Sequence, residues 1–142
     1  MRLIQFAAPL LLLVLAACGG SSTTVTPKVT PAVPKWGQST YTIVTPGQTS
    51  VSASVSVVAG TNPLPASVDV TIAPPPPAAS SSYITYPTAP ITATSGGSYQ
   101  VPVSFSVTTD GSGAYPVGSW QFQATITVNG VTSSSVMTLI VQ

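Results

Sequence analysis

Most of the chain after residue 35 alternates apolar and polar residues with a period of two. Such alternation places successive side chains on opposite faces of an extended segment, so it predicts half-buried β-strands. The alternation is clearest in residues 50–58, 67–72, 99–107 and 118–128, and weaker in residues 39–44 and 89–94. No useful window has the 3.6-residue period of an amphipathic helix, so the pattern predicts an all-β domain.

The last two predicted strands are joined by Asn129-Gly130, a dipeptide that favours a two-residue type I′ turn. This turn fixes the register of the hairpin and gives one apolar face and one polar face. The predicted pairs on the apolar face include Val128 with Val131, Phe122 with Met137 and Trp120 with Leu139. Two further apolar residues, Val136 and Ile140, fall on the polar face.

Turn signals separate the predicted strands at short intervals. Residues 45–48, 60–65, 74–77 and 110–113 are rich in Pro, Gly and Asp, as connections are. About seven short antiparallel strands without a helix predict a single β-sandwich in residues 36–142, with a small β-barrel as the alternative. Pro102 lies inside one strand pattern and indicates an edge strand there, because proline has no N–H for a ladder.

The C-terminal hairpin adds a resemblance to this pattern. GSWQFQATITV, then NG, then VTSSSVMTLIV resembles the last two strands of bacterial immunoglobulin-like and fibronectin type III-like domains. The resemblance implies an immunoglobulin-like sandwich. The chain departs from antibody domains in having no cysteine pair, and Trp36 is a loose candidate for the early tryptophan of fibronectin modules.

The first residues have the pattern of a signal peptide. Arg2 is followed by an apolar run over residues 3–15 and by the small residues Ala16 and Ala17. The run of about 13 residues suits a signal sequence and is shorter than the roughly 20 residues of a membrane-spanning helix. Residues 1–17 are therefore predicted to be removed.

The sequence Leu15-Ala16-Ala17-Cys18 resembles the lipobox of bacterial lipoproteins. The resemblance implies cleavage between Ala17 and Cys18 and acylation of Cys18 with diacylglycerol and a further acyl group such as palmitate. Several acyl chains anchor a protein stably in a bilayer, whereas one does not. Gly19, in place of an Asp, implies the outer membrane of a Gram-negative envelope, and a Gram-positive host stays open. The alternative is an ordinary secretory signal with a chance or buried Cys18.

The segment GGSSTTVTPKVTPAVPK, residues 19–35, shows no hydrophobic period. Its prolines favour extended polyproline-II geometry, which at ~3.1 Å per residue would hold a domain up to roughly 50 Å from the bilayer. The sequence thus predicts three parts: a signal peptide over 1–17, a lipidated cysteine and tether over 18–35, and the sandwich over 36–142. A glycosylated stalk or simple disorder are the alternatives for the tether.

Charge is scarce, at 4% of residues. The charged residues are Arg2, Lys28, Lys35, Asp69 and Asp110, and the chain has neither Glu nor His. General acid–base and nucleophilic catalysis need a base that this sandwich lacks, so we expect no enzyme and no cofactor. Nucleic acid is excluded as a partner because phosphate binding needs a basic surface, and metal is not expected because suitable ligands are missing.

Two kinds of residue remain as candidate sites. Asp110 lies in a Thr-Asp-Gly-Ser-Gly loop, where calcium would need 6–8 oxygen ligands, so a turn residue is the favoured interpretation. Tyr83, Tyr86 and Tyr115 lie in loops and are candidates for an exposed platform that contacts a glycan or a partner chain. The alternative is that the three rings cover the ends of the sandwich.

These observations predict a lipid-anchored protein of the bacterial envelope that acts as a non-catalytic structural or protein-binding module. Its expected partners are the bilayer, through acylated Cys18, and another envelope protein. The alternatives are a carbohydrate-binding or adhesion module and an accessory subunit of an envelope complex. Strand edges with so little protective charge predict self-association once the lipid is removed.

Overall fold

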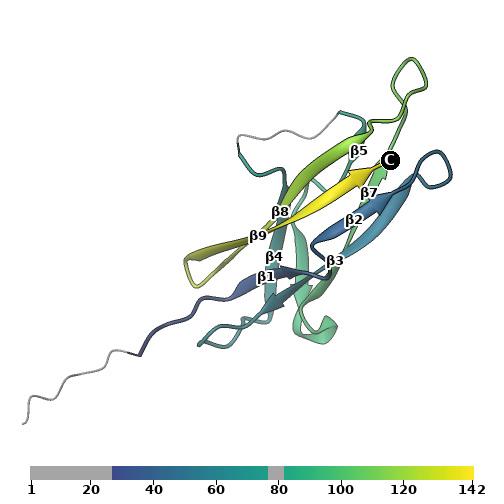
Figure 1. Cartoon of the computed structure of the whole chain (residues 1–142). Helices are drawn as coiled ribbons and strands as arrows, with labels where there is room; N and C mark the ends of the chain where they lie inside the picture. Colours follow the sequence, from purple (N-terminus) through teal and green to yellow (C-terminus); the bar gives the residue numbers. More distant parts are fainter. Residues whose placement is uncertain (1–26, 77–81) are drawn as a thin grey trace, which may run out of the picture.

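A computed structural model describes residues 27–76 and 82–142, so the predictions for the signal peptide, for Ala17 and for Cys18 lie outside the described residues. The regular secondary structure of the described part consists of β-strands (Figure 1) and one 3₁₀ turn, η1 (Ser95–Gly97). No helix in residues 27–76 and 82–142 has the length and apolarity to cross a bilayer.

The strands form a four-stranded sheet A, in the order β1-β3-β7-β5, and a five-stranded sheet B, in the order β2-β9-β8-β4-β6. All neighbours are antiparallel except β2 and β9, which are parallel. The bounds are β1 (Val33–Trp36), β2 (Thr40–Ile43), β3 (Ser50–Val58), β4 (Ser67–Ala73), β5 (Ile84–Thr85), β6 (Ile91–Thr94), β7 (Gln100–Val107), β8 (Gly118–Val128) and β9 (Val131–Val141). All-β character is confirmed, in a sandwich-like arrangement.

Seven of these strands coincide with predicted ones, and the sequence missed β1 and β5. β5 has two residues and β1 has four, of which Pro34 and Lys35 give no clear apolar and polar pattern. The prediction of about seven strands was therefore too low for the described residues. Alternation is visible only where a strand is long enough to repeat it.

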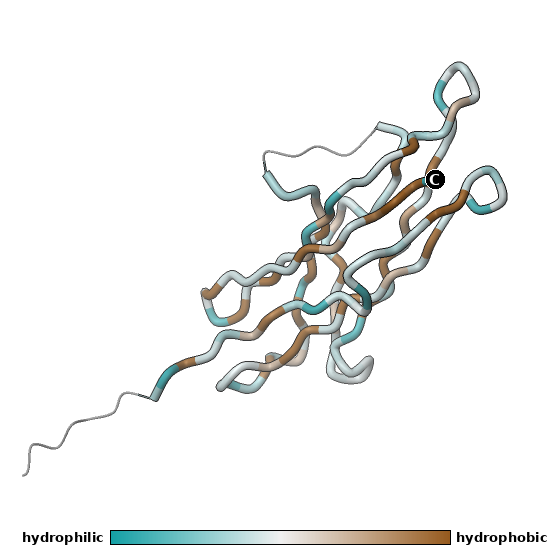
Figure 2. The backbone as a smooth tube through the Cα atoms, viewed as in Figure 1, coloured by the Kyte–Doolittle hydropathy of each residue, from teal (hydrophilic) through white to brown (hydrophobic). Residues whose placement is uncertain are grey.

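The core lies between the two sheets and is formed by buried apolar side chains from both. Figure 2 shows hydrophobic and hydrophilic residues spread along the strands of both sheets. Phe105 of sheet A and Phe122 of sheet B meet there with ring centroids 4.7 Å apart. Trp36 packs against Phe105 at 6.2 Å, and its indole N–H donates to the Ser135 carbonyl of β9 at 3.1 Å. Among the described residues no polar or charged side chain is classed as buried, so apolar burial dominates the stability of the fold.

The predicted register of the C-terminal hairpin is confirmed. β8 and β9 pair Val128 with Val131, and the ladder continues in this register to Gly118 and Val141. Asn129 and Gly130 both have positive φ, 52° and 77°, as a type I′ turn requires. Val136 lies on the outer face and is 47% exposed.

β7 is not the last strand of sheet A, but at Pro102 its side away from β3 has no neighbouring strand in the described part of the chain. Backbone hydrogen bonds from Val57 to Tyr99 and from Val107 to Thr49, both 2.9 Å, fix the odd-numbered residues of β7 as the ones bonded to β3. The Pro102 nitrogen therefore faces away from β3. On that side β5 pairs only with Val107 and Ser106, so no N–H is needed at position 102.

The folded part begins earlier than the predicted boundary at residue 36. The Thr30 N–H donates to Thr61 Oγ1 at 2.8 Å, and the Thr61 N–H donates to the Thr30 carbonyl at 2.9 Å. Ala32 is buried, and β1 begins at Val33. Residues from Thr30 onward are therefore part of the sandwich, which begins before residue 36.

Candidate functional site

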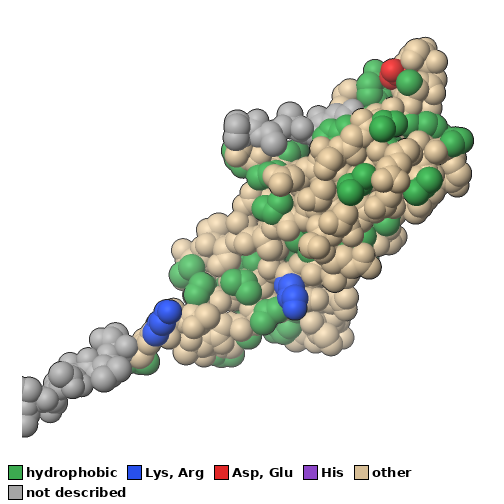
Figure 3. All heavy atoms as spheres, in the orientation of Figure 1, with side chains coloured by type: hydrophobic (Ala, Val, Ile, Leu, Met, Phe, Trp, Pro, Cys, Tyr) green, Lys and Arg blue, Asp and Glu red, His purple; other side chains and the backbone are tan. Residues whose placement is uncertain are grey.

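The face drawn in Figure 3 has small, scattered apolar areas and very few charged side chains. The described residues carry four charged side chains, Lys28, Lys35, Asp69 and Asp110. The described residues contain no group of three or more His, Cys, Asp or Glu side chains that could hold a metal ion. A binding site on this surface must therefore rely mainly on hydroxyl, backbone and aromatic groups.

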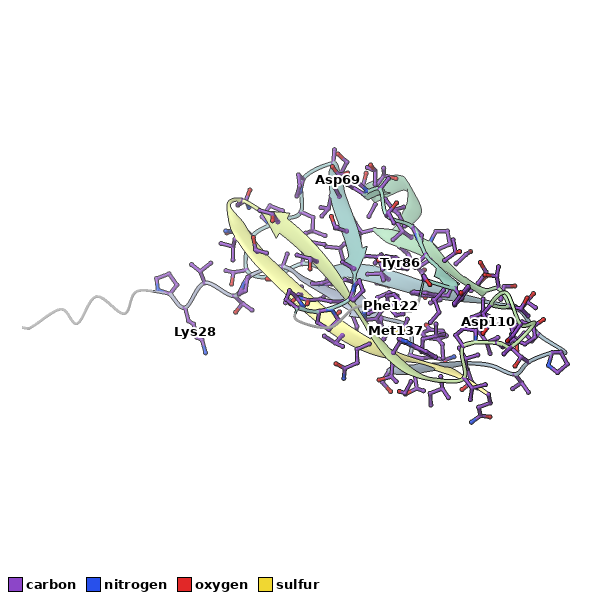
Figure 4. The ribbon with its side chains drawn as sticks, turned by 90° about the horizontal axis from the view of Figure 1, so that it is seen from above. Lys28, Asp69, Tyr86, Asp110, Phe122 and Met137 are labelled. Atoms are coloured by element: carbon purple, nitrogen blue, oxygen red, sulfur yellow. The ribbon has the colours of Figure 1, made fainter. Side chains whose placement is uncertain are left out.

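The three candidate tyrosines do not form one exposed platform. The Tyr86 ring is half-buried and packs edge-on against Phe122, with centroids 5.0 Å apart (Figure 4). Tyr115 is also half-buried against the core, whereas Tyr83 is 39% exposed. Two of the three rings thus cover the core, as the alternative interpretation predicts, and Tyr83 stays the candidate for ligand contact.

Asp110 organises its own loop. Its Oδ1 accepts hydrogen bonds from the Ser112 hydroxyl at 2.6 Å, the Ser112 N–H at 2.8 Å and the Ala114 N–H at 2.9 Å. The Ser112 hydroxyl, followed by these backbone donors, lowers the pKa of the Asp110 carboxyl below its ordinary value of 3.8. The geometry is that of a turn residue, in agreement with the favoured interpretation.

A groove opens on the outer face of sheet B where β4 and β8 separate. The two strands pair from Ala73 and Gln123 to Val70 and Ile126. Beyond this point β4 extends back to Ser67 and β8 extends on to Val128, but the two strands no longer pair with each other. The space between them, about 390 Å³, is lined by Ser67, Val68, Asp69, Thr71, Thr125, Ile126 and Thr127; we call it the sheet-B groove.

The chemistry of the sheet-B groove is that of hydroxyls and one carboxylate. Asp69 Oδ1 accepts a hydrogen bond from the Thr92 hydroxyl of β6 at 2.8 Å. The Thr127 hydroxyl shares a hydrogen bond with the Thr132 hydroxyl at 2.9 Å. Such groups suit hydrogen bonding to a neutral polar ligand or to an extended peptide.

Sequence reasoning missed this groove. Asp69 faces solvent on β4, and nothing in the alternation shows that β4 and β8 separate beside it. The one local signal is that the alternating apolar pattern of each strand continues beyond Val70 and Ile126, where the pairing of β4 with β8 ends. The separation depends on the paths of two strands far apart in the sequence.

Comparison with known proteins adds no relative, since neither the protein-family models nor the curated proteins match the chain. The residues and geometry described above are therefore the basis for the function proposed below.

Proposed function

We propose that the chain is a lipid-anchored protein of the bacterial envelope whose sandwich is a non-catalytic structural or protein-binding module. The observation that carries this proposal is the lipobox-like sequence Leu15-Ala16-Ala17-Cys18 at the end of an apolar run. It stands roughly nine residues before the described chain begins at Pro27, a distance that suits a short connection between an anchor and a folded domain.

The sheet order supports an immunoglobulin-like form of the sandwich. The order β1-β3-β7-β5 corresponds to strands A-B-E-D of immunoglobulin domains, and β9-β8-β4 corresponds to G-F-C. The position of β6 is a departure, because it follows β5 in the chain yet flanks β4 on the other sheet. Immunoglobulin-like sandwiches commonly serve as binding or spacer modules, which fits the proposed role.

The arrangement of the two carboxylates supports a non-catalytic role. The Asp69 carboxylate accepts a hydrogen bond from Thr92, and the Asp110 carboxylate accepts one from Ser112 in its own loop. The two carboxylates therefore belong to separate parts of the molecule. No His accompanies either of them. General acid–base catalysis needs a proton donor and a proton acceptor close together. The two carboxylates of the described residues do not form such a pair.

The anchor can be tested by replacing Cys18. We expect the wild-type chain to incorporate a palmitate analogue and to fractionate with membranes of a bacterial host. The Cys18→Ala variant should be unlabelled and leave the membrane fraction, because the acylated thiol is lost. Gly20→Ala, which keeps the lipobox, is the matched control. A Cys18→Ala variant that stays in the membrane fraction would refute the anchor.

The binding role can be tested by crosslinking in intact envelopes. Thr127→Lys places a long cation in the sheet-B groove, whereas Gln121→Lys places the same side chain on an exposed part of β8 away from it. We expect one protein partner to be recovered with the wild type and with Gln121→Lys and to be lost with Thr127→Lys. Recovery of no specific partner with the wild type would contradict a protein-binding module.

Carbohydrate binding is a second candidate, favoured by the hydroxyls and the Asp69 carboxylate of the sheet-B groove. Sugar hydroxyls pair well with such groups, and exposed Tyr83 offers a separate aromatic contact. We would compare the wild type, Asp69→Asn and Tyr83→Ala on a glycan array. Binding lost in Asp69→Asn but kept in Tyr83→Ala would assign a glycan to the groove, and the reverse would assign it to the tyrosine loop.

A further inference from the structure

Four exposed valines gather at the end of the sandwich where the N-terminal segment enters; we call this the tether end. They are Val29, Val33, Val58 and Val131, with 63%, 41%, 44% and 49% of their surface exposed. Val33 and Val58 are direct partners across β1 and β3. Val29 and Val131 line one shallow groove, together with Pro31 and Ala32. The four valines therefore surround the entry of the chain.

The core does not require these valines. Val33 and Val58 lie on the outer face of sheet A, where the next pair along, Lys35 and Ser56, is polar. Val131 directly follows the turn at the tip of the β8–β9 hairpin. Of the seven exposed valines in the described residues, four gather at this end, and Val44, Val117 and Val136 lie elsewhere. A group of exposed apolar side chains beside the entry of the chain is typical of a surface that is covered.

The same end is cationic. Lys28 adjoins Val29, and Lys35 follows Val33 on the outer face of β1. Figure 3 shows both basic groups in the half of the molecule where the chain enters, and Figure 4 shows Lys28 and Asp110 at opposite ends. The negative charge of Asp69 on sheet B offsets part of this positive charge. One of its carboxylate oxygens accepts a hydrogen bond from the Thr92 hydroxyl.

The chain outside the structure limits how far this end can be from a membrane. From Cys18 to Pro27 the chain spans at most roughly 30 Å when fully extended. β8 runs from Gly118 at the far end to Val128 beside the tether end, so the far end is separated from the anchor by the length of the sandwich. Tethering also raises the local concentration of bilayer around this surface, so even weak affinity is effective.

We propose that the tether end docks on the bilayer, with its valines in the interfacial region and Lys28 and Lys35 against anionic phospholipid headgroups. The proposal rests on the anchoring of Cys18 proposed above. It adds that the domain lies with one defined end on the membrane and presents the far loops to the aqueous side.

A single-cysteine fluorophore can test this orientation. Lipidation consumes the Cys18 thiol, so Val131→Cys provides a label at the tether end. Val117→Cys provides a matched label at the far end, at a side chain that is 69% exposed. The full lipidated chain is reconstituted in phosphatidylcholine vesicles containing phosphatidylglycerol and a headgroup spin-labelled lipid. We expect the label at 131 to be quenched several-fold more than the label at 117.

Mere proximity to the anchor would also quench the label at 131, so two further variants separate docking from proximity. Val33→Ser combined with Val58→Ser removes apolar contact, and Lys28→Gln combined with Lys35→Gln removes charge. We expect each pair, and omission of phosphatidylglycerol, to reduce quenching at 131 and to leave quenching at 117 unchanged. Unchanged thermal unfolding would show that the variants stay folded.

Equal quenching at the two positions, or quenching at 131 that no variant alters, would overturn docking on the bilayer. Loss of quenching at 131 when an envelope protein is added would overturn it in favour of a protein occupant. Flotation with the vesicles separates the two proposals: a chain that floats but shows no selective quenching refutes only the docking. A chain that is not acylated and does not float refutes the anchor and the docking together.

Discussion

At the scale of single residues, Asp110 acts within its loop. Its pKa is lower in the folded chain than in the unfolded one, so its ordering effect is fully present above pH 3.8 and is lost as the pH falls through the lower folded value. We expect Asp110→Ala to increase amide exchange at Ser112 and Ala114 at neutral pH, and Asp110→Asn to do so less, because an amide oxygen still accepts hydrogen bonds. Hydrogen exchange by NMR would measure this, and equal exchange in all three chains would contradict it.

Gly60 shows why the N-terminal segment belongs to the sandwich. A Cβ at this position would overlap the Thr30 carbonyl and the Pro31 backbone. We expect Gly60→Ala to destabilise the fold by about 1–3 kcal/mol, because backbone must shift to admit the methyl group. Gly111→Ala is the matched control, since a Cβ there meets no atom within 4 Å. Thermal unfolding of both variants measures the difference, and similar Tm values would argue against the close packing.

At the scale of elements, β7 is protected by proline rather than by charge. Pro102 presents no N–H on the side that β5 leaves uncovered. We expect Pro102→Val to add an exposed donor and to promote edge-to-edge association at unchanged Tm. Ser104→Val, on the same outward side of the same strand, controls for added apolar surface. Light scattering against concentration measures the association, and equal behaviour of the two variants would exclude an effect of the new donor.

The sequence predicted elements well where a local pattern determines them. The Asn129-Gly130 turn fixes the hairpin register because only one register keeps Phe122 and Met137 inside. The sequence did not predict the features that depend on how distant segments pack together in three dimensions. Nothing local reveals that β4 and β8 separate beside Asp69, that the Tyr86 ring packs on Phe122, or that a four-residue strand ends at Trp36. The start of the sandwich before residue 36 was missed for the same reason, because the docking of Thr30 on Thr61 joins residues 31 apart.

At the scale of the whole molecule, the two ends of the sandwich differ in chemistry. The tether end combines four exposed valines with both lysines, whereas the far end carries exposed Val117 and Asp110, whose carboxylate accepts hydrogen bonds within its own loop. The sheet-B groove adjoins the tether end, because its Thr127 precedes Val128, which lines the shallow groove at the tether end.

The scarcity of charge has a consequence for the whole fold that can be measured. The described residues include no His and no Glu, and no residue type in them has an ordinary pKa between about 5 and 9. Stability depends on pH only where proton binding differs between the folded and unfolded states. We expect the Tm to stay constant over this range and to decline only in acid, where Asp110 becomes protonated. A maximum or a step between pH 5 and 9 would contradict this.

Self-association should be equally insensitive to pH, because two lysines and two aspartates leave the described residues with no net charge throughout this range. We therefore expect added charged side chains to reduce self-association, whereas a change of pH should leave it unchanged. Gln121→Lys combined with Thr132→Lys adds two cations to exposed outer positions of β8 and β9. The pair should lower association of the delipidated chain without changing its Tm, since neither side chain packs in the core. Association that persists in this variant would locate its cause in apolar contact, with the tether-end valines as the first surface to replace.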